Sequence, residues 1–318
     1  MVPVLITIDT EYSAGLFARG IAADCSENFE RAIACRSDRG EAGIFYQMDV
    51  FDRYGVKAVF FVDPMPALVW GQGAVDAVVQ PIIERGHEVQ LHCHTEWLSF
   101  AENSLLPGRT GVNIKDFTQA EQYALLEWGL ERIEQAGAPR PTAFRAGNYG
   151  ANDDTLRALA QLGMQWDSSF PAGLAGSLCD ITLPMGDCRP VRHCGLQEFP
   201  ASAISSRDGW RHAQVTALSF SEMRAAISHA AKANWPGFCL VSHSFELFNR
   251  DTQRPNALLC HRFEKLCEWL GSSGEATSAG FDDLDVDLAS PHLALLPHKY
   301  MRTGARMAEQ LAANTVFR

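Results

Sequence analysis

Short apolar runs rich in β-branched residues alternate along the chain with longer amphipathic segments. No other feature of the sequence restricts the fold as strongly. The apolar runs predict strands at residues 4–8, 58–62, 88–92, 142–145, 165–167 and 238–242. The amphipathic segments predict helices at residues 44–54, 74–85, 119–136, 153–162, 221–233 and 256–270. Strands and helices that alternate in this way form an α/β fold with a parallel sheet, either open or closed into a barrel.

The length of 318 residues suits one large α/β domain. No linker is long or biased enough to force a division, so we expect residues 1–318 to form a single domain. Its motif-bearing core spans about residues 2–270, and residues 271–318 form a C-terminal extension. Two irregular stretches, residues 12–43 and 98–116, interrupt the alternation, and long insertions of this kind usually carry function or cover a site.

The charge and the cysteine content exclude several classes of protein. Acidic side chains number 38 and Lys plus Arg number 27, which gives a net charge of −11 and disfavours binding to nucleic acid through bulk charge. No apolar run approaches the roughly 18 residues of a membrane span, and the N-terminus lacks the pattern of a secretory signal. The nine cysteines form no CxxC pair, which is typical of reduced thiols. We therefore expect a cytoplasmic protein.

Ionisable residues gather where the predicted strands end. In parallel α/β folds, functional sites are built from the carboxyl ends of the strands, so we expect these side chains to converge on one cleft. The residues in question are Asp9, Glu11, His92, His94, Glu96, Arg145, Asp167 and His243.

Carboxylates and imidazoles together form a mixed oxygen and nitrogen ligand set that suits Zn²⁺ or a similar divalent ion. His92 and His94 share one face if the strand continues beyond His92, whereas a helical turn after His92 would make Glu96 its partner. A metal with an open position lowers the pKa of bound water to about 7. A carboxylate beside it can accept the proton of that water, and a histidine across the cleft can protonate the leaving group. Arg145 and Asp167 would then orient the carboxylate and the histidine.

The motifs that carry these residues resemble, in order, those of the polysaccharide deacetylases, also called the NodB-homology family or carbohydrate esterase family 4. The similar segments are TIDTE at residues 7–11, AVFFV at 58–62, GHEVQLH at 86–92, RAGNYG at 145–150, WDSSFP at 166–171 and VSH at 241–243. The run HCHTEW at residues 92–97 is most similar to the branch related to the lipopolysaccharide-biosynthesis protein WalW.

The resemblance implies a distorted (β/α) barrel with about seven parallel strands and the metal-dependent removal of N- or O-acetyl groups from sugars. It implies that Asp9 is the general base and His243 the general acid, and that Arg145 and Asp167 orient them. It also implies that Tyr149, or the neighbouring amide, lies near the oxyanion of the reaction.

The same resemblance implies that Glu11 and His92 bind a divalent metal, for which we expect zinc. The family's second motif is His-x-x-x-His, but its last position here is Glu96 and an extra histidine stands at His94. The register of the motif favours Glu96 as the third ligand and would suit a harder ion, whereas His94 would make a set more typical of zinc. The family's first motif has adjacent acids, but here a threonine separates Asp9 from Glu11. A degraded metal site is a further alternative.

The expected substrate is an acetylated sugar, and without an export signal we expect a glycan precursor inside the cell, such as a nucleotide-linked or lipid-linked sugar. One alternative is the hydrolysis of a cyclic amide by the same fold. Another is a carbohydrate-binding protein without activity, which Glu96 in place of histidine would favour. A metal-free glycosidase is disfavoured, because retaining carboxylate pairs sit about 5 Å apart and come from different strands. Dimers are the commonest soluble assemblies, so a homodimer is compatible with this chain.

Overall fold

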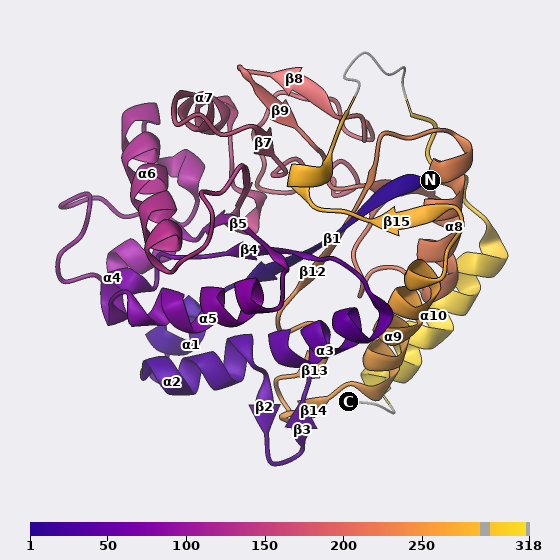
Figure 1. The fold of residues 1–318 in the computed structure, drawn as a ribbon, viewed down its shortest axis with the longest axis horizontal. Coiled ribbons are helices and arrows are strands. Elements are labelled where there is room, and N and C mark those ends of the chain that lie inside the picture. The colour runs from indigo at the N-terminus through magenta and orange to yellow at the C-terminus, as the bar shows by residue number, and fades with distance from the viewer. Residues whose placement is uncertain (287–292, 316–318) are drawn as a thin grey trace.

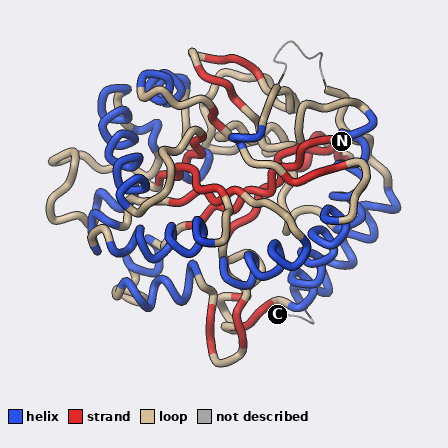
Figure 2. Tube along the Cα trace, viewed as in Figure 1, coloured by secondary structure: helices blue, strands red, loops and turns tan. Residues whose placement is uncertain are grey.

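Parallel strands form the centre of the molecule, and helices surround them (Figures 1 and 2). The computed structural model describes residues 1–286 and 293–315. Within them, the parallel strands follow the order β12 (Phe238–His243), β1 (Val2–Thr10), β4 (Val59–Val62), β5 (Glu88–Cys93), β6 (Ala143–Ala146), β7 (Trp166–Asp167) and β9 (Leu196–Glu198). β8 (Val191–His193) pairs antiparallel with β9, and β15 (Ala276–Ser278) pairs parallel with the start of β1. The predicted α/β class with about seven parallel strands is confirmed.

All six predicted helices are present. They are α3 (Ile44–Tyr54), α5 (Gly73–Glu84), α6 (Gln119–Gln135), α7 (Asp153–Gln161), α8 (Phe220–Lys232) and α9 (Ala257–Gly271). α6 begins at a capping box, in which Thr118 accepts the backbone N–H of Glu121 and the Glu121 carboxylate accepts the backbone N–H of Thr118. Such caps set where a helix begins, and the apolar face of each helix packs on the sheet.

The sheet curls so that one of its faces is enclosed. Alternate residues of β1 point to opposite faces: Val4, Ile6 and Ile8 join the core beneath the helices, while Leu5 joins a smaller inner cluster. The other members of the inner cluster are Val59, Phe61, Ala143, Trp166, Phe199, Ala201, Cys239, Val241 and Phe281. Among the described residues no ladder of strands joins β12 to β9. Irregular backbone bridges them instead, with hydrogen bonds of 3.0 Å from the Ser202 N–H to the Cys239 carbonyl and 2.9 Å from the Val241 N–H to the Ala213 carbonyl.

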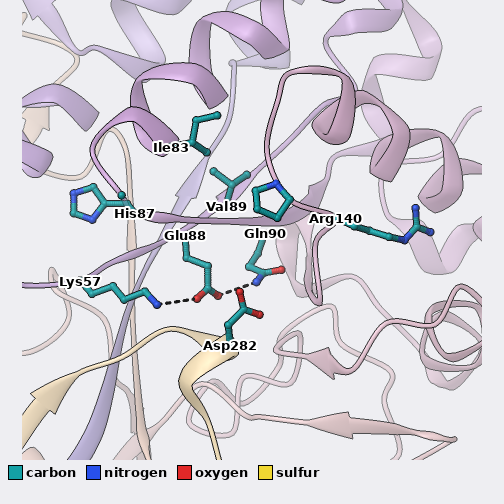
Figure 3. Close-up of a pocket in the computed structure, with 10 residues that line it drawn as sticks. Lys57, Ile83, His87, Glu88, Val89, Gln90, Arg140 and Asp282 are labelled. Carbon is teal, nitrogen blue, oxygen red and sulfur yellow. Dashed lines mark hydrogen bonds and ion pairs between the residues drawn. The ribbon is translucent and has the colours of Figure 1, made fainter.

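The amino-terminal end of the sheet is closed by a short 3-10 turn, η5 (Phe281–Asp283). Glu88, at the start of β5, accepts hydrogen bonds from the Phe281 N–H at 2.9 Å and from Gln90 Nε2 at 2.8 Å, and its other oxygen lies 3.7 Å from Lys57 Nζ. These side chains line a cavity of about 190 Å³ (Figure 3). The glutamate of the GHE motif therefore ties the C-terminal segment to the bottom of the sheet.

The insertion at residues 12–43 folds into α1 (Ala14–Ala18), α2 (Cys25–Asn28), the π-helical turn η1 (Phe29–Ile33) and a hairpin of β2 (Arg36–Ser37) and β3 (Gly40–Glu41). This hairpin lies beside a second one, β13 (Phe248–Asn249) and β14 (Arg254–Pro255), at the lower edge of Figure 1. The Ser37 hydroxyl donates to the Gln253 carbonyl at 2.6 Å. The sequence patterns predicted neither hairpin.

The C-terminal segment continues the fold. β15 extends the sheet beside β1, and α10 (Tyr300–Thr315) lies against α8 and α9 (Figure 1). Arg306 on α10 lies 3.3 Å from Glu222 of α8, and Arg262 on α9 lies 2.9 Å from Glu309 of α10.

None of the helices in the described parts of the chain has the length and apolar character that crossing a membrane requires.

Candidate functional site

Glu11, His92 and His94 bring three potential metal-ligand atoms together at the carboxyl ends of β1 and β5. These atoms lie within 4.8 Å of one another. Glu11 Oε2 is 3.3 Å from His92 Nε2 and also contacts His94 Nε2. Asp63, at the end of the intervening strand β4, accepts a hydrogen bond from the His94 backbone N–H at 3.3 Å. The strand ends therefore converge as the sequence predicts.

The Nδ1 atoms of both imidazoles already have hydrogen-bond partners. His92 Nδ1 lies 2.7 Å from the Arg145 carbonyl, to which it must donate, and His94 Nδ1 lies 2.8 Å from Glu96 Oε2. With hydrogens on Nδ1, each neutral imidazole presents an Nε2 lone pair to the Glu11 carboxylate, so an acceptor meets an acceptor unless Nε2 is protonated or binds a cation. A divalent cation between them would satisfy all three groups. The donor set and the supported histidines fit a zinc-type site with an open position.

Glu96 lies outside this cluster of ligand atoms. It accepts a hydrogen bond from the side chain of His94, and it stands in a 3-10 turn, η2 (Thr95–Ser99), beyond the strand. The geometry therefore does not support the register argument that favoured Glu96 over His94 as third ligand. Burial opposes protonation of His94, but the charge of Glu11 and the contacts with Glu11 and Glu96 outweigh it and raise the pKa of His94 well above its ordinary value.

Asp9 is held by a buried arginine. Arg145 Nη1 donates to Asp9 Oδ1 at 2.6 Å and to Thr7 Oγ1 at 2.9 Å. The same guanidinium donates to the Ser168 carbonyl at 3.2 Å and to the Ser168 hydroxyl at 3.1 Å, and it lies 4.4 Å from the centre of the Phe61 ring. Burial opposes the charge of Arg145, but Asp9 outweighs it and raises the pKa of the guanidinium. The salt bridge therefore fixes the position of the Asp9 carboxylate.

His243 faces Asp9 from the neighbouring strand. The two residues are partners in the β1–β12 register, and His243 Nε2 lies 3.8 Å from Asp9 Oδ2. On the other side of the ring, His243 Nδ1 lies 2.7 Å from Glu246 Oε1, and Glu246 also accepts hydrogen bonds from Ser242 and Gln214. Burial lowers the pKa of His243, but the hydrogen bond and charge of Glu246 outweigh it and raise this pKa to about 9. The imidazole is therefore protonated at neutral pH.

The predicted pairing of Asp167 with His243 is wrong. In the described structure, Asp167 accepts hydrogen bonds from the Ser169 N–H at 2.9 Å and the Ser169 hydroxyl at 2.7 Å, and it lies opposite Glu198 in the β7–β9 register. Side chains alternate along an extended chain, so Asp167 points away from the face that carries Ser168. The segment after β7 thus supports Arg145 through Ser168, and Glu246 holds His243 instead.

The turn after β6 packs on the cluster formed by Glu11, His92 and His94. It comprises residues 147–150, and Asn148 and Tyr149 both have a φ of 56°, an uncommon left-handed conformation for residues with side chains. A Cβ placed on Gly147 would lie 2.8 Å from the ring of His94, so this glycine allows close approach. The Tyr149 hydroxyl, which the resemblance implies to lie near the oxyanion, is 2.9 Å from His212 Nε2.

Sequence reasoning missed three polar residues of the site. Glu246 follows His243 by three residues, a spacing that could have suggested it. Asp63 ends a predicted strand, as the other candidates do, and burial raises its pKa to about 7. His212 left no signal, because β11 (Gly209–His212) is a short strand outside the main sheet. Burial and the charge of Arg145 lower the pKa of His212 to about 3, so its imidazole is neutral.

A cavity of about 170 Å³ opens beside Glu11 and His94. Glu11, His94, Glu96 and Asn148 line one side of it, while residues 12–15 and Ala32 of the insertion line another. The insertion therefore covers the site, as its length suggested.

A second group of potential ligands, Asp153, His193 and Cys194, lies on α7 and at the turn between β8 and β9. His193 Nε2 is 2.9 Å from Asp153 Oδ1, and Thr182 donates to the same carboxylate through its N–H and its hydroxyl. This hydrogen-bond network accounts for the arrangement without an ion, and the group offers a control for metal measurements.

Comparisons with known proteins agree with these observations. The family described as Polysaccharide deacetylase matches residues 34–166. A Mycobacterium smegmatis protein assigned as a polysaccharide deacetylase has a similar structure, with a TM-score of 0.56 and 14% identity over 94% of this chain and 96% of that chain. A family 4 carbohydrate esterase from Streptomyces lividans, solved in complex with acetate, gives a TM-score of 0.42 and 12% identity over 93% and 98%. The peptidoglycan deacetylase PdaC from Bacillus subtilis gives 0.40 and 11% over 99% and 98%.

A search of curated proteins found no match. At 14% identity, the likeness to the mycobacterial structure shows the fold alone. The segment matched to the family contains His92, His94 and Arg145, whereas Asp9 and His243 lie outside it. Residues 34–166 are thus similar to this family, and most of the chain has a fold similar to that of the mycobacterial protein.

Proposed function

We propose that this protein is a polysaccharide deacetylase, a metal-dependent hydrolase that removes an acetyl group from a sugar, and the family match at residues 34–166 supports this proposal. One observation carries the proposal. Two imidazole Nε2 atoms face the Glu11 carboxylate while hydrogen bonds engage both Nδ1 atoms. Three protein ligands with supported histidines and an open position are typical of catalytic zinc sites.

Glu11, His92 and His94 would hold the ion, which would supply a Lewis acid and an acidified water at the acetyl carbonyl. Asp9 is the proposed general base. It lies two residues before Glu11, and Arg145, which also donates to Thr7, fixes its carboxylate. Asp9 accepts the proton of the attacking water as the new C–O bond forms.

His243 is the proposed general acid. Its Nε2 lies 3.8 Å from Asp9 Oδ2, and Glu246 keeps it protonated. His243 donates its proton to the leaving nitrogen or oxygen of the sugar as the bond to the acetyl carbon breaks. The products are acetate and a free amine or hydroxyl.

We propose a small glycan precursor as the substrate, as opposed to a stretch of polymer. The cavity of about 170 Å³ beside Glu11 and His94 is smaller than typical ligand sites of roughly 300–1,000 Å³. The insertion forms part of its wall. Assignment to the WalW-related branch stays a prediction that rests on the run at residues 92–97.

The test measures acetate release from N-acetylated and O-acetylated sugars by the purified protein. We expect turnover that a chelator abolishes and zinc or cobalt restores, and that Asp9→Asn and His243→Ala each reduce by about 100-fold or more. Asp154→Asn is the control, because Asp154 pairs with Arg157 on the surface. Turnover of cyclic amides alone would identify the alternative hydrolase. No turnover with any substrate by metal-loaded protein would contradict the proposal and favour a binding protein.

A further inference from the structure

Three arginines line a cavity of about 360 Å³ next to the catalytic one. They are Arg19, which follows α1, Arg31 in η1, and Arg250 after β13, and among the described residues that line the cavity Asp251 alone carries a carboxylate. Two of the arginines belong to the insertion at residues 12–43. Segments far apart in the sequence thus meet around one cavity.

Arg250 joins this cavity to the catalytic one. Arg250 lines both cavities. In the catalytic cavity it is accompanied by Glu11, His94 and Glu96. Its guanidinium lies 4.3 Å from the centre of the Phe245 ring, and this ring also lines the catalytic cavity. Stacking on an aromatic ring holds a guanidinium in place while its edge stays available for hydrogen bonds.

The other two guanidinium groups are also held by local contacts. Arg19 Nε donates to the Gly15 carbonyl at 2.9 Å, and Arg31 pairs with Glu27 at 3.0 Å. Each guanidinium carries five N–H donors, so these contacts use a minority of them. The remaining donors can bind an anion without any rearrangement of the backbone.

The charge of the lining runs against that of the whole protein. The three arginines outnumber Asp251 and Glu27, the partner of Arg31, so the charge around this cavity is positive, whereas the chain carries −11. Planar guanidinium groups match phosphate oxygens in pairs, and a positive cavity raises the local concentration of anions.

We propose that this arginine-lined cavity binds a phosphate or diphosphate group attached to the acetylated sugar, and that this contact directs the acetyl group to the neighbouring metal site. The catalytic part of this inference rests on the proposed function, whereas anion binding itself does not. The shared chemistry is a sugar phosphate ester, which a nucleoside diphosphate sugar or an isoprenyl diphosphate sugar could supply.

The first experiment measures the binding of inorganic pyrophosphate by calorimetry. The Arg19→Gln/Arg250→Gln variant is expected to bind at least about tenfold more weakly than the wild type, because charged hydrogen bonds are lost. Arg207→Gln is the matched control, since Arg207 has an exposed side chain on the β10 (Ala203–Ser206) to β11 turn. The His92→Ala variant distinguishes pyrophosphate binding at the arginines from binding at the metal, because this variant should lose the metal and still bind pyrophosphate. Equal affinity in the wild type and the double arginine variant would overturn the inference.

The second experiment compares kcat/KM for an N-acetylated sugar joined to a nucleoside diphosphate, to an isoprenyl diphosphate and to a methyl group. The kcat/KM for each diphosphate substrate, divided by that for the neutral methyl glycoside, should fall by at least about tenfold in the double variant. The diphosphate substrate with the higher kcat/KM identifies the source of the phosphate. An unchanged ratio would contradict the inference even if deacetylation is real. If no substrate is turned over but pyrophosphate binding depends on the arginines, the anion site stands and the proposed function fails.

Discussion

Replacing Glu246 with glutamine removes the charge that keeps His243 protonated. In the wild type, Glu246 Oε1 lies 2.7 Å from His243 Nδ1, and the Glu246 side chain is almost fully buried. The amide of glutamine keeps the shape and can still accept the hydrogen bond through its oxygen. The variant therefore changes mainly the electrostatic contribution of Glu246.

The structure sets the size of the expected effect. The pKa of His243 is raised to about 9 from the ordinary 6.5, and each pKa unit corresponds to about 1.4 kcal/mol. The surroundings therefore favour the protonated imidazole by roughly 3 kcal/mol. Burial acts against protonation, and Glu246 supplies the first two of the opposing contributions. Without its charge, the pKa of His243 should fall by at least about one unit.

The assay is the pH profile of kcat/KM for acetate release. The alkaline limb should lie near pH 9 in the wild type and at least about one unit lower in Glu246→Gln. Ser242→Ala is the control, because Ser242 donates to Glu246 but leaves its charge in place. A raised pKa contributes stability that is complete below pH 6.5 and lost as the pH rises through about 9. The wild type should therefore exceed Glu246→Gln in unfolding free energy below pH 6.5, and this difference should become smaller as the pH rises to about 9. An alkaline limb that does not move would refute the role of Glu246.

Four further variants test the rest of the site. His94→Gln should abolish metal binding, whereas Glu96→Gln should keep the stoichiometry and weaken affinity by about 10–100-fold, as measured by competition with a chelating dye. Gly147→Ala should weaken metal binding as well, because the new Cβ would lie 2.8 Å from the His94 ring. Arg145→Met should reduce the free energy of urea unfolding by about 3–5 kcal/mol, because it leaves Asp9 buried without its partner.

Each of these expectations has a result that would contradict it. If Glu96→Gln lost the metal and His94→Gln retained it, Glu96 would be the third ligand, as the register of the family's motif indicates. Wild-type affinity in Gly147→Ala would mean that the turn yields to the added methyl group. Adding Asp9→Asn to Arg145→Met should recover part of the lost stability, and no recovery would mean that the arginine acts through packing alone.

The strand and helix pattern was predictable because each long element carries its own periodicity. The helix predicted at residues 44–54 coincides with α3, and residues 4–8 lie within β1. The hairpins of β2 with β3 and of β13 with β14 were not predictable, because two-residue strands carry no periodicity. Their position depends on contacts between distant segments.

Which residue is the proposed third metal ligand depends on where β5 ends. His94 is still extended, with φ −107° and ψ 104°, so its side chain shares a face with that of His92. The 3-10 turn begins one residue later and carries Glu96 away from the cluster. The sequence contained both alternatives, and no local signal fixed the residue at which the strand stops.

Asp167 illustrates a different difficulty. Its neighbour Ser168 reaches Arg145, and strand alternation then directs Asp167 to the opposite face. A two-residue strand such as β7 does not reveal which face is the inner one. His212 left no pattern at all, since only tertiary packing brings it to Tyr149.

The central claim is that Glu11, His92 and His94 hold a catalytic metal, and elemental analysis tests it most directly. Wild type, His92→Ala and Cys194→Ser are purified and analysed side by side, the last because Cys194 belongs to the second group of potential ligands. We predict one equivalent of a divalent metal in wild type and Cys194→Ser, and none in His92→Ala. No metal in any of the three after incubation with zinc or cobalt, or equal metal in all three, would contradict the account.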